Sequence, residues 1–96
     1  MDKQQIVTFL RTNKKYIQDN FQISIVALYG SYSRDEATEN SDIDLVYENT
    51  GSSPFKKFIE AEYFLNSNLN KNVELVNIKY MNPLVKKFAQ KDFVYV

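Results

Sequence analysis

The positions of the apolar residues predict three helices. Apolar side chains recur at helical spacing over about residues 2–19, 54–68 and 82–89. Each range starts beside a residue type that caps helix N-termini, and two of the three have proline at the first helical position. These capping residues and prolines are Asp2, Ser53 with Pro54, and Asn82 with Pro83. We therefore expect the three helices to begin there.

Apolar, β-branched runs predict the strands. The first is a buried strand over about residues 22–29, the second covers about 42–48, and Val73–Ile78 forms the third. Between the first two strands, the segment from Ser31 has room for only one or two helical turns. The last residues, Phe93–Val96, suit either a short strand or a docking tail.

The resulting order is helix, strand, short helical turn, strand, helix, strand, helix. It predicts one domain over residues 1–96, of the α/β or α+β class, with helices covering a small sheet. The first two strands are expected to be neighbours, whereas spacing alone leaves their relative direction open.

Composition restricts the chemistry. Lys and Arg number 12, as do Asp and Glu, so no overall charge favours nucleic acid or an anionic membrane, and we expect neither as a partner. The absence of histidine excludes Ser-His and Cys-His catalysis and leaves acid–base chemistry to carboxylates, Lys, Tyr or metal-bound water. Because cysteine and long apolar runs are also absent, we expect a cytoplasmic protein without disulfides.

The segment from Gly30 to Asp44 carries the strongest indication of chemistry. It reads Gly-Ser, ten residues, Asp-Ile-Asp, with a predicted strand on either side. Gly30 lets a ligand approach the backbone closely, and the amides that begin the following turn attract an anion. With the Ser31 hydroxyl, they suit a phosphate group. Arg34 lies on about the same side of that turn and can reach a phosphate oxygen.

Paired carboxylates follow at the start of the second strand. Asp42 and Asp44 share one strand face, about 7 Å apart, because strand side chains alternate. Two ionised carboxylates placed so repel each other unless a cation lies between them. Mg²⁺ suits this position, since it usually binds one or two carboxylates plus substrate phosphates. Glu74, the only acid inside the third strand, is the candidate third carboxylate of a two-metal site.

Each feature alone has a simpler interpretation. A Gly-Ser pair is usually a turn, and an Asp-x-Asp pair is usually a solvated strand face. Arg34 is typical of a surface residue paired with Asp35 or Glu36, and Glu74 suits the polar side of a half-exposed strand. The spacing excludes an EF-hand and a P-loop. The joint occurrence of these features favours a nucleotide site, while for Arg34 both interpretations stay open.

On these residues the chain resembles the nucleotidyltransferase superfamily related to DNA polymerase beta, and within it the minimal nucleotidyltransferases. The stretch from Leu28 to Leu45 carries that family's Gly-Ser, ten residues, Asp-x-Asp signature. The ending, from Asn82 to Val96, is also typical, so the resemblance spans nearly the whole chain. It implies the nucleotidyltransferase fold, a small mixed sheet covered by helices.

The resemblance implies an activity and roles for the site residues. The family uses ATP with Mg²⁺, two ions being expected, and transfers AMP to a hydroxyl group with release of pyrophosphate. Gly30 and Ser31 would bind the β- and γ-phosphates. Asp42 and Asp44 would bridge the metal ions, while Glu74 would hold one ion and help to deprotonate the acceptor.

The resemblance also implies a partner. Minimal nucleotidyltransferases are often paired with HEPN-domain toxins, and the implied acceptor is then a tyrosine hydroxyl of the toxin. Adding AMP there introduces bulk and negative charge and disables the toxin, so this chain would be the antitoxin, in a hetero-oligomer.

Two residues depart from the family pattern. Asp35 stands where relatives often have glycine; if the backbone there is left-handed, Asp tolerates it less well than Gly but better than most residues. Glu74 stands where many members have Asp, and its extra methylene displaces the carboxylate by about a bond length.

Two other functions stay open. A catalytically weak protein could neutralise its partner by occlusion alone, and the aromatic residues near the end of the chain suit an interface in either case. The remaining alternative is transfer to a small molecule such as an aminoglycoside. One small domain lacks an additional substrate domain to form the other wall of such a site, although an oligomer could supply that wall.

Overall fold

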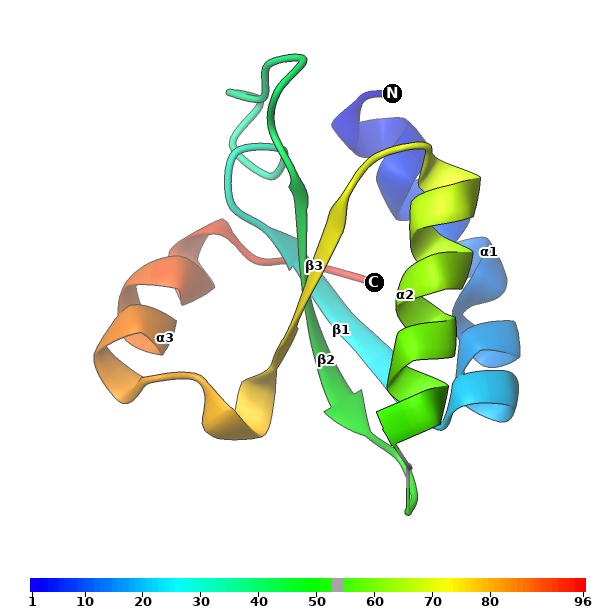
Figure 1. Cartoon of the computed structure of the whole chain (residues 1–96). Coiled ribbons are helices and arrows are strands. Elements are labelled where there is room, and N and C mark those ends of the chain that lie inside the picture. Colours follow the sequence, from blue (N-terminus) through cyan, green and yellow to red (C-terminus); the bar gives the residue numbers. More distant parts are fainter. Residues whose placement is uncertain (53–54) are drawn as a thin grey trace.

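The computed structural model describes residues 1–52 and 55–96 (Figure 1). In chain order the elements are α1 (Lys3–Phe21), β1 (Ile23–Tyr29), β2 (Ile43–Asn49), α2 (Phe55–Leu69), β3 (Val73–Asn77), the 3-10 helix η1 (Ile78–Tyr80), α3 (Pro83–Ala89), the 3-10 helix η2 (Gln90–Asp92) and β4 (Val94–Tyr95). The predicted order of helices and strands is confirmed. The helix start predicted at Ser53 and Pro54 lies outside the described residues. Across the described ranges, no helix is long and apolar enough to cross a membrane.

The four strands form one mixed sheet in the order β3-β2-β1-β4. β1 is antiparallel to β2 and to β4, whereas β2 and β3 are parallel. The prediction that β1 and β2 are neighbours is confirmed, and of the two interpretations of the last residues the strand is observed. Because β1 runs opposite to β2 and β3, the end of β1 lies beside the starts of the other two.

An irregularity in β1 changes which of its residues face the helices. The pairing with β2 shifts between Ile25 and Ala27, as in a β-bulge. Ile25 before the shift and Leu28 after it are both fully buried in the main core. Opposite residues of an antiparallel pair share a face, so Tyr29 lies on the same face as its partner Asp44.

The main core lies between the sheet and the layer formed by α1 and α2 (Figure 1). Fully buried aliphatic side chains come from both helices and from β1 and β2: Ile6, Leu10, Ile17, Ile25, Ile43, Leu45 and Leu65. Burying each Leu or Ile side chain contributes about 1.5–3 kcal/mol. This layer therefore holds in register the two strands that flank the Gly30 to Asp44 segment.

α1 begins where the sequence predicted. A carboxylate oxygen of Asp2 accepts from the amide of Gln5 at 2.9 Å, and Gln5 Oε1 accepts from the amide of Asp2 at 2.9 Å. This reciprocal capping box satisfies two backbone donors that a helix start otherwise leaves unpaired. The helix continues to Phe21, beyond the expected end at residue 19, and Gln22 closes it in a left-handed conformation (φ 58°).

The elements β3 and α3 differ from prediction in bounds and burial. β3 stops at Asn77, one residue early, because the Asn77 side chain accepts from the amide of Lys79 at 2.9 Å and starts η1. α3 lies on the other side of the sheet from α1 and α2 (Figure 1). Its cap is confirmed, since Asn82 Oδ1 accepts from the amide of Leu84 at 2.9 Å. The predicted apolar face of α3, however, is uncovered: every side chain of this helix is exposed or half-buried.

Candidate active site

The chain leaves β1 through a single tight turn. The carbonyl of Gly30 accepts from the amide of Arg34 at 3.3 Å, as in one turn of helix. Asp35 then takes a left-handed conformation (φ 58°), and the amide of Glu36 donates to the carbonyl of Ser31 at 2.9 Å. This is the arrangement that ends many helices. One turn from Ser31, within the predicted one or two, is therefore observed, together with the left-handed backbone considered for Asp35.

Replacing Asp35 is expected to show how much the left-handed backbone conformation at this position lowers the free energy of unfolding. Asp35→Gly should be at least as stable as the parent, whereas Asp35→Ala should be about 1 kcal/mol less stable than Asp35→Gly, because a β-carbon disfavours the left-handed region. Urea unfolding of the two variants measures this difference. Lys3→Met is the control, since it removes the ion pair between Lys3 and Asp35 (3.1 Å) and a long hydrogen bond from Lys3 to the Ser33 carbonyl (3.4 Å), both of which are worth little. Equal stability of the Ala and Gly variants would contradict the assignment.

Gly30 brings the two halves of the sequence motif together. It has a positive φ of 78°, which favours glycine. A β-carbon at this position would overlap the Oδ2 atom of Asp44. The backbone at the end of β1 therefore lies directly against the Asp44 carboxylate, as the motif predicts for a site that joins a phosphate to a carboxylate-bound cation.

Two of the three predicted carboxylates lie on neighbouring strands in direct register. Asp44 on β2 pairs with Glu74 on the parallel strand β3. Asp42, which was expected inside the second strand, lies one residue before β2 and is exposed. Its charge still acts on Asp44, so all three acids contribute to one electrostatic site.

The electrostatics of this site are unfavourable for three ionised acids. The pKa of Asp44 is raised from 3.8 to about 6, first by burial and then by the negative charges of Glu74 and Asp42. A side-chain hydrogen bond with Glu74 also raises the pKa of Asp44, because two carboxyl groups can share a hydrogen bond only when one of them is protonated. The positive charge of Arg34 lowers this pKa. The site thus favours a proton or a bound cation.

The raised pKa of Asp44 predicts an unusual dependence of stability on pH for the metal-free protein. A carboxyl group that is harder to ionise in the folded state stabilises the fold fully below its unfolded pKa, near pH 4, and this stability is lost as pH rises through about 6. We expect a loss of about 1–2 kcal/mol over this range, after solvent screening of a half-buried group. Urea unfolding with EDTA from pH 4 to pH 7.5 measures it. The loss should be smaller in Asp44→Asn, and an equal loss in that variant would contradict the assignment.

Tyr29 is a site residue that the sequence analysis missed. It lies beside Asp44 across the strand pair, and its ring meets that of Phe93 at a centroid distance of 5.9 Å. Its pKa is raised from 10.0 to about 12, by burial first and then by the charges of Asp44 and Glu74. The hydroxyl therefore stays protonated at neutral pH. The sequence shows that Tyr29 directly precedes Gly30. The sheet face on which Tyr29 lies, however, depends on the bulge in β1.

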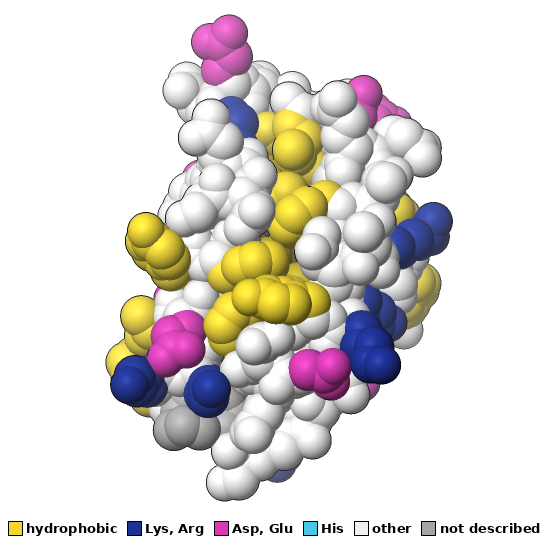
Figure 2. All heavy atoms as spheres, turned by 90° about the vertical axis from the view of Figure 1, so that its right-hand side faces the viewer, with side chains coloured by type: hydrophobic (Ala, Val, Ile, Leu, Met, Phe, Trp, Pro, Cys, Tyr) yellow, Lys and Arg dark blue, Asp and Glu magenta, His cyan; other side chains and the backbone are white. Residues whose placement is uncertain are grey.

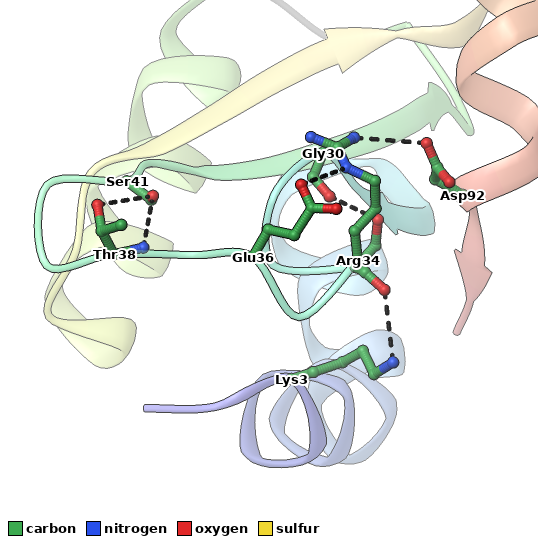
Figure 3. Close-up of polar contacts among 8 residues, drawn as sticks. Lys3, Gly30, Arg34, Glu36, Thr38, Ser41 and Asp92 are labelled. Carbon is green, nitrogen blue, oxygen red and sulfur yellow. Dashed lines mark hydrogen bonds and ion pairs between the residues drawn. The ribbon is translucent and has the colours of Figure 1, made fainter.

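Arg34 stands at the rim of the site. Figure 3 shows its guanidinium group between Glu36, at 3.5 Å from Nε, and Asp92 in η2, at 3.4 Å from Nη1. Pairing with Glu36 was one of the simpler interpretations, whereas Asp35 pairs with Lys3 instead. Both Arg34 contacts are partly exposed, so each is weak and the guanidinium group can exchange a carboxylate for a phosphate at small cost. Its charge also acts on Asp44, so both interpretations of Arg34 are compatible with the structure.

The residues present suit a hard divalent cation, although they are not gathered around one. Within residues 1–52 and 55–96, no three acidic, His or Cys side chains stand close enough together to hold a metal ion. The donors at the site are oxygen atoms, as Mg²⁺ requires, and the raised pKa of Asp44 marks a deficit of positive charge there. The carboxylates that would hold Mg²⁺ are therefore Asp42, Asp44 and Glu74, with side-chain rearrangement and substrate phosphates completing the coordination.

Comparison with known proteins identifies a family for this chain. The family model described as "Nucleotidyltransferase domain" matches residues 10–96. A Methanocaldococcus jannaschii protein named "Putative protein adenylyltransferase MJ0128" is 38% identical over 94 residues, covering 96% of this chain and 95% of that protein. "Protein adenylyltransferase MntA" of Thermococcus cleftensis is 31% identical over 93 residues, covering 97% of this chain and 94% of its own.

Solved structures share the fold. One described as a putative minimal nucleotidyltransferase superposes with a TM-score of 0.76 at 20% identity, covering 100% of this chain and 97% of the other. A toxin–antitoxin structure with AMP-PNP gives 0.68 at 23% identity, covering 99% and 72%. A complex of the tri-AMPylated HEPN toxin of Shewanella oneidensis with MNT antitoxin gives 0.57 at 20% identity, covering 97% and 66%. With its motif, its fold and these relatives, the chain belongs to the nucleotidyltransferase domain family, and proteins named protein adenylyltransferases are among its relatives.

Proposed function

We propose that this protein transfers AMP from ATP to a tyrosine hydroxyl of a HEPN-domain toxin and thereby acts as its antitoxin. The observation that carries the proposal is the contact of the Gly30 backbone with the Asp44 carboxylate, with Glu74 in register on the next strand. The naming of a 31% identical relative as a protein adenylyltransferase, and of a fold neighbour as an antitoxin with an AMPylated HEPN toxin, supports the acceptor class. Because ATP is a cytoplasmic substrate, the proposed location of the reaction is the cytoplasm.

The residues at the end of β1 are proposed to bind the triphosphate. The absence of a β-carbon at Gly30 lets its backbone lie against the Asp44 carboxylate, and the amide and hydroxyl of Ser31 supply donors for phosphate oxygens. Arg34 exchanges its weak contacts with Glu36 and Asp92 for a phosphate oxygen. These groups hold the β- and γ-phosphates and so fix the position of the α-phosphorus relative to Asp44.

The carboxylates are proposed to hold the metal and to move the proton. Mg²⁺, held by Asp42, Asp44 and Glu74, would neutralise the phosphates and stabilise the charge that develops during transfer. The acceptor oxygen forms a bond to the α-phosphorus, the bond from the α-phosphorus to the bridging oxygen breaks, and pyrophosphate leaves. The hydroxyl proton passes to a carboxylate oxygen of Glu74, an exposed acid of β3 in register with Asp44.

Neutralisation by occlusion alone is the second candidate. Two observations favour it: the carboxylates are not gathered for metal binding within the described residues, and α3 presents uncovered apolar side chains near the site. Such a protein would bind the toxin tightly and inhibit it without ATP.

One assay separates these functions. The protein is incubated with ATP labelled on the α-phosphate, Mg²⁺ and the HEPN-domain protein encoded beside it, with an aminoglycoside in a parallel reaction. We expect label on a tyrosine of the HEPN protein, recovered toxin activity when ATP is omitted, and loss of label in Asp42→Ala/Asp44→Ala. Toxin inhibition without label, equal in the double variant, would support occlusion. Label on the aminoglycoside alone, or no HEPN-domain neighbour, would overturn the proposed acceptor.

A further inference from the structure

An uncovered apolar and basic surface lies beside the candidate active site. We define the α3 patch as Tyr80 of η1 with Leu84, Val85 and Phe88 of α3, and the flanking Lys79, Lys86, Lys87 and Lys91. Resting on the proposed function, we propose that this patch docks an apolar and acidic segment of the protein that carries the acceptor hydroxyl. The substrate would thus be selected by this surface, at a distance from the reacting atoms.

The apolar side chains of the α3 patch are unusually accessible. Tyr80 is 77% exposed, Leu84 69%, Phe88 67% and Val85 54%. Four large apolar side chains within nine residues, all more than half exposed, are costly to leave in water. The Asn82 cap and Pro83 stabilise the start of this helix by local contacts, without burying these side chains.

Charge identifies the chemistry of the partner. Residues 78–91 contain four of the chain's 12 basic residues and no acidic residue, although the whole chain is neutral. Two of these cations sit over aromatic rings of the patch: Lys79 Nζ lies 5.7 Å from the centre of the Tyr80 ring, and Lys91 Nζ lies 5.8 Å from that of Phe88. A matching surface therefore offers apolar side chains surrounded by carboxylates.

The α3 patch is connected to the site by the residues that follow it. Asp92 of η2 contacts Arg34 at 3.4 Å, and Phe93 packs against Tyr29 on the face that carries Asp44. Figure 1 shows α3 on this side of the sheet, away from α1 and α2. A protein seated on the patch would therefore cover the same face as the carboxylates and could present a hydroxyl group to them.

The opposite side of the molecule is a less suitable docking surface. Figure 2 shows apolar side chains along the layer formed by α1 and α2, where they largely contact one another. The ring of Phe64 lies 6.2 Å from that of Phe9, 5.2 Å from Tyr16 and 5.6 Å from Phe21. A partner bound there would be separated from Asp44 by the sheet. The exposed Tyr63 of this layer, at 75%, provides a matched control.

The test measures binding and transfer separately. Affinity for the HEPN-domain protein encoded beside this chain is measured by calorimetry in an Asp44→Asn background, so that no AMP is transferred, and ATP affinity and the unfolding midpoint are measured on the same variants. Phe88→Ser and Lys86→Glu/Lys87→Glu should each weaken HEPN binding about 10-fold or more. The charge reversal should act more strongly at low salt. Tyr63→Ser and Lys15→Glu should change HEPN binding less than about 2-fold, and all variants should keep their ATP affinity.

Each result bears on one conclusion. Wild-type HEPN affinity in both α3 patch variants, or an equal loss in the controls, would overturn the docking surface even if AMP transfer proceeds. Loss of affinity in the patch variants, with no AMP transferred by the wild type, would support the surface and overturn the proposed transfer. A single-stranded RNA probe that binds through Phe88 and Lys87, with HEPN binding unchanged, would assign the patch to nucleic acid and overturn the protein partner.

Discussion

Asp44→Asn is expected to abolish AMP transfer while leaving the fold as stable as the parent or more stable. The amide keeps the size of the side chain but removes a charge that would help to hold Mg²⁺ beside Gly30 and Glu74 in this site, so kcat should fall by about 10³-fold or more. At pH 7.5 the parent must keep Asp44 ionised against burial and two neighbouring acids. Removing that charge should therefore stabilise the metal-free protein, by about 1 kcal/mol.

The opposite signs of these two effects distinguish a site residue from a structural one. Glu48→Gln is the matched control, since Glu48 also lies on β2, on the same face as Asp44, but at the far end of the strand. Its transfer activity should stay within about 2-fold of the parent, and its unfolding free energy within about 0.5 kcal/mol. Labelled transfer and urea unfolding measure the two quantities. More than a tenth of parental activity in Asp44→Asn would remove this carboxylate from the proposed mechanism.

The parts of the site that are local in sequence could be predicted from the sequence. Gly30 directly follows one strand and Asp44 lies near the start of the next. A single turn with its return segment joins them, so the spacing predicts that they meet. The place of Glu74 also follows from the order strand, helix, strand, because such a crossover usually joins parallel strands of one sheet. The second strand was expected to start at Asp42 but starts at Ile43, a difference of one residue at an element boundary.

Other features depend on tertiary contacts that no local pattern records. The run from Ile23 to Tyr29 reads as one continuous buried strand, so the shift near residue 26 that turns Tyr29 toward Asp44 could not be predicted. The apolar spacing in α3 was read correctly, but whether the face is buried depends on what packs over it. The predicted strand at Ile78 failed because the Asn77 side chain competes for the backbone and starts a 3-10 helix.

Gly30→Ala is expected to reduce both stability and activity, through two separable causes. A β-carbon at φ 78° disfavours the backbone by about 1–2 kcal/mol. The same β-carbon would overlap Asp44 Oδ2, so the carboxylate must turn away from the position proposed for metal and phosphate binding. We expect a loss of about 2–3 kcal/mol in unfolding free energy and about a 100-fold fall in transfer rate. Gly51→Ala is the control, because its β-carbon would meet Gln22 Oε1 at an ordinary 3.5 Å.

A double-mutant cycle with Asp44→Ala separates the two causes. Asp44→Ala removes the Oδ2 and Cγ atoms that a β-carbon at Gly30 would meet, and leaves only the β-carbon of residue 44, in ordinary contact. In that background Gly30→Ala should cost only the backbone contribution, about 1–2 kcal/mol, and the coupling energy measures the overlap. The same cost in both backgrounds would mean that the Gly30 backbone does not press on Asp44, and the contact on which the proposed phosphate and metal site depends would then be absent.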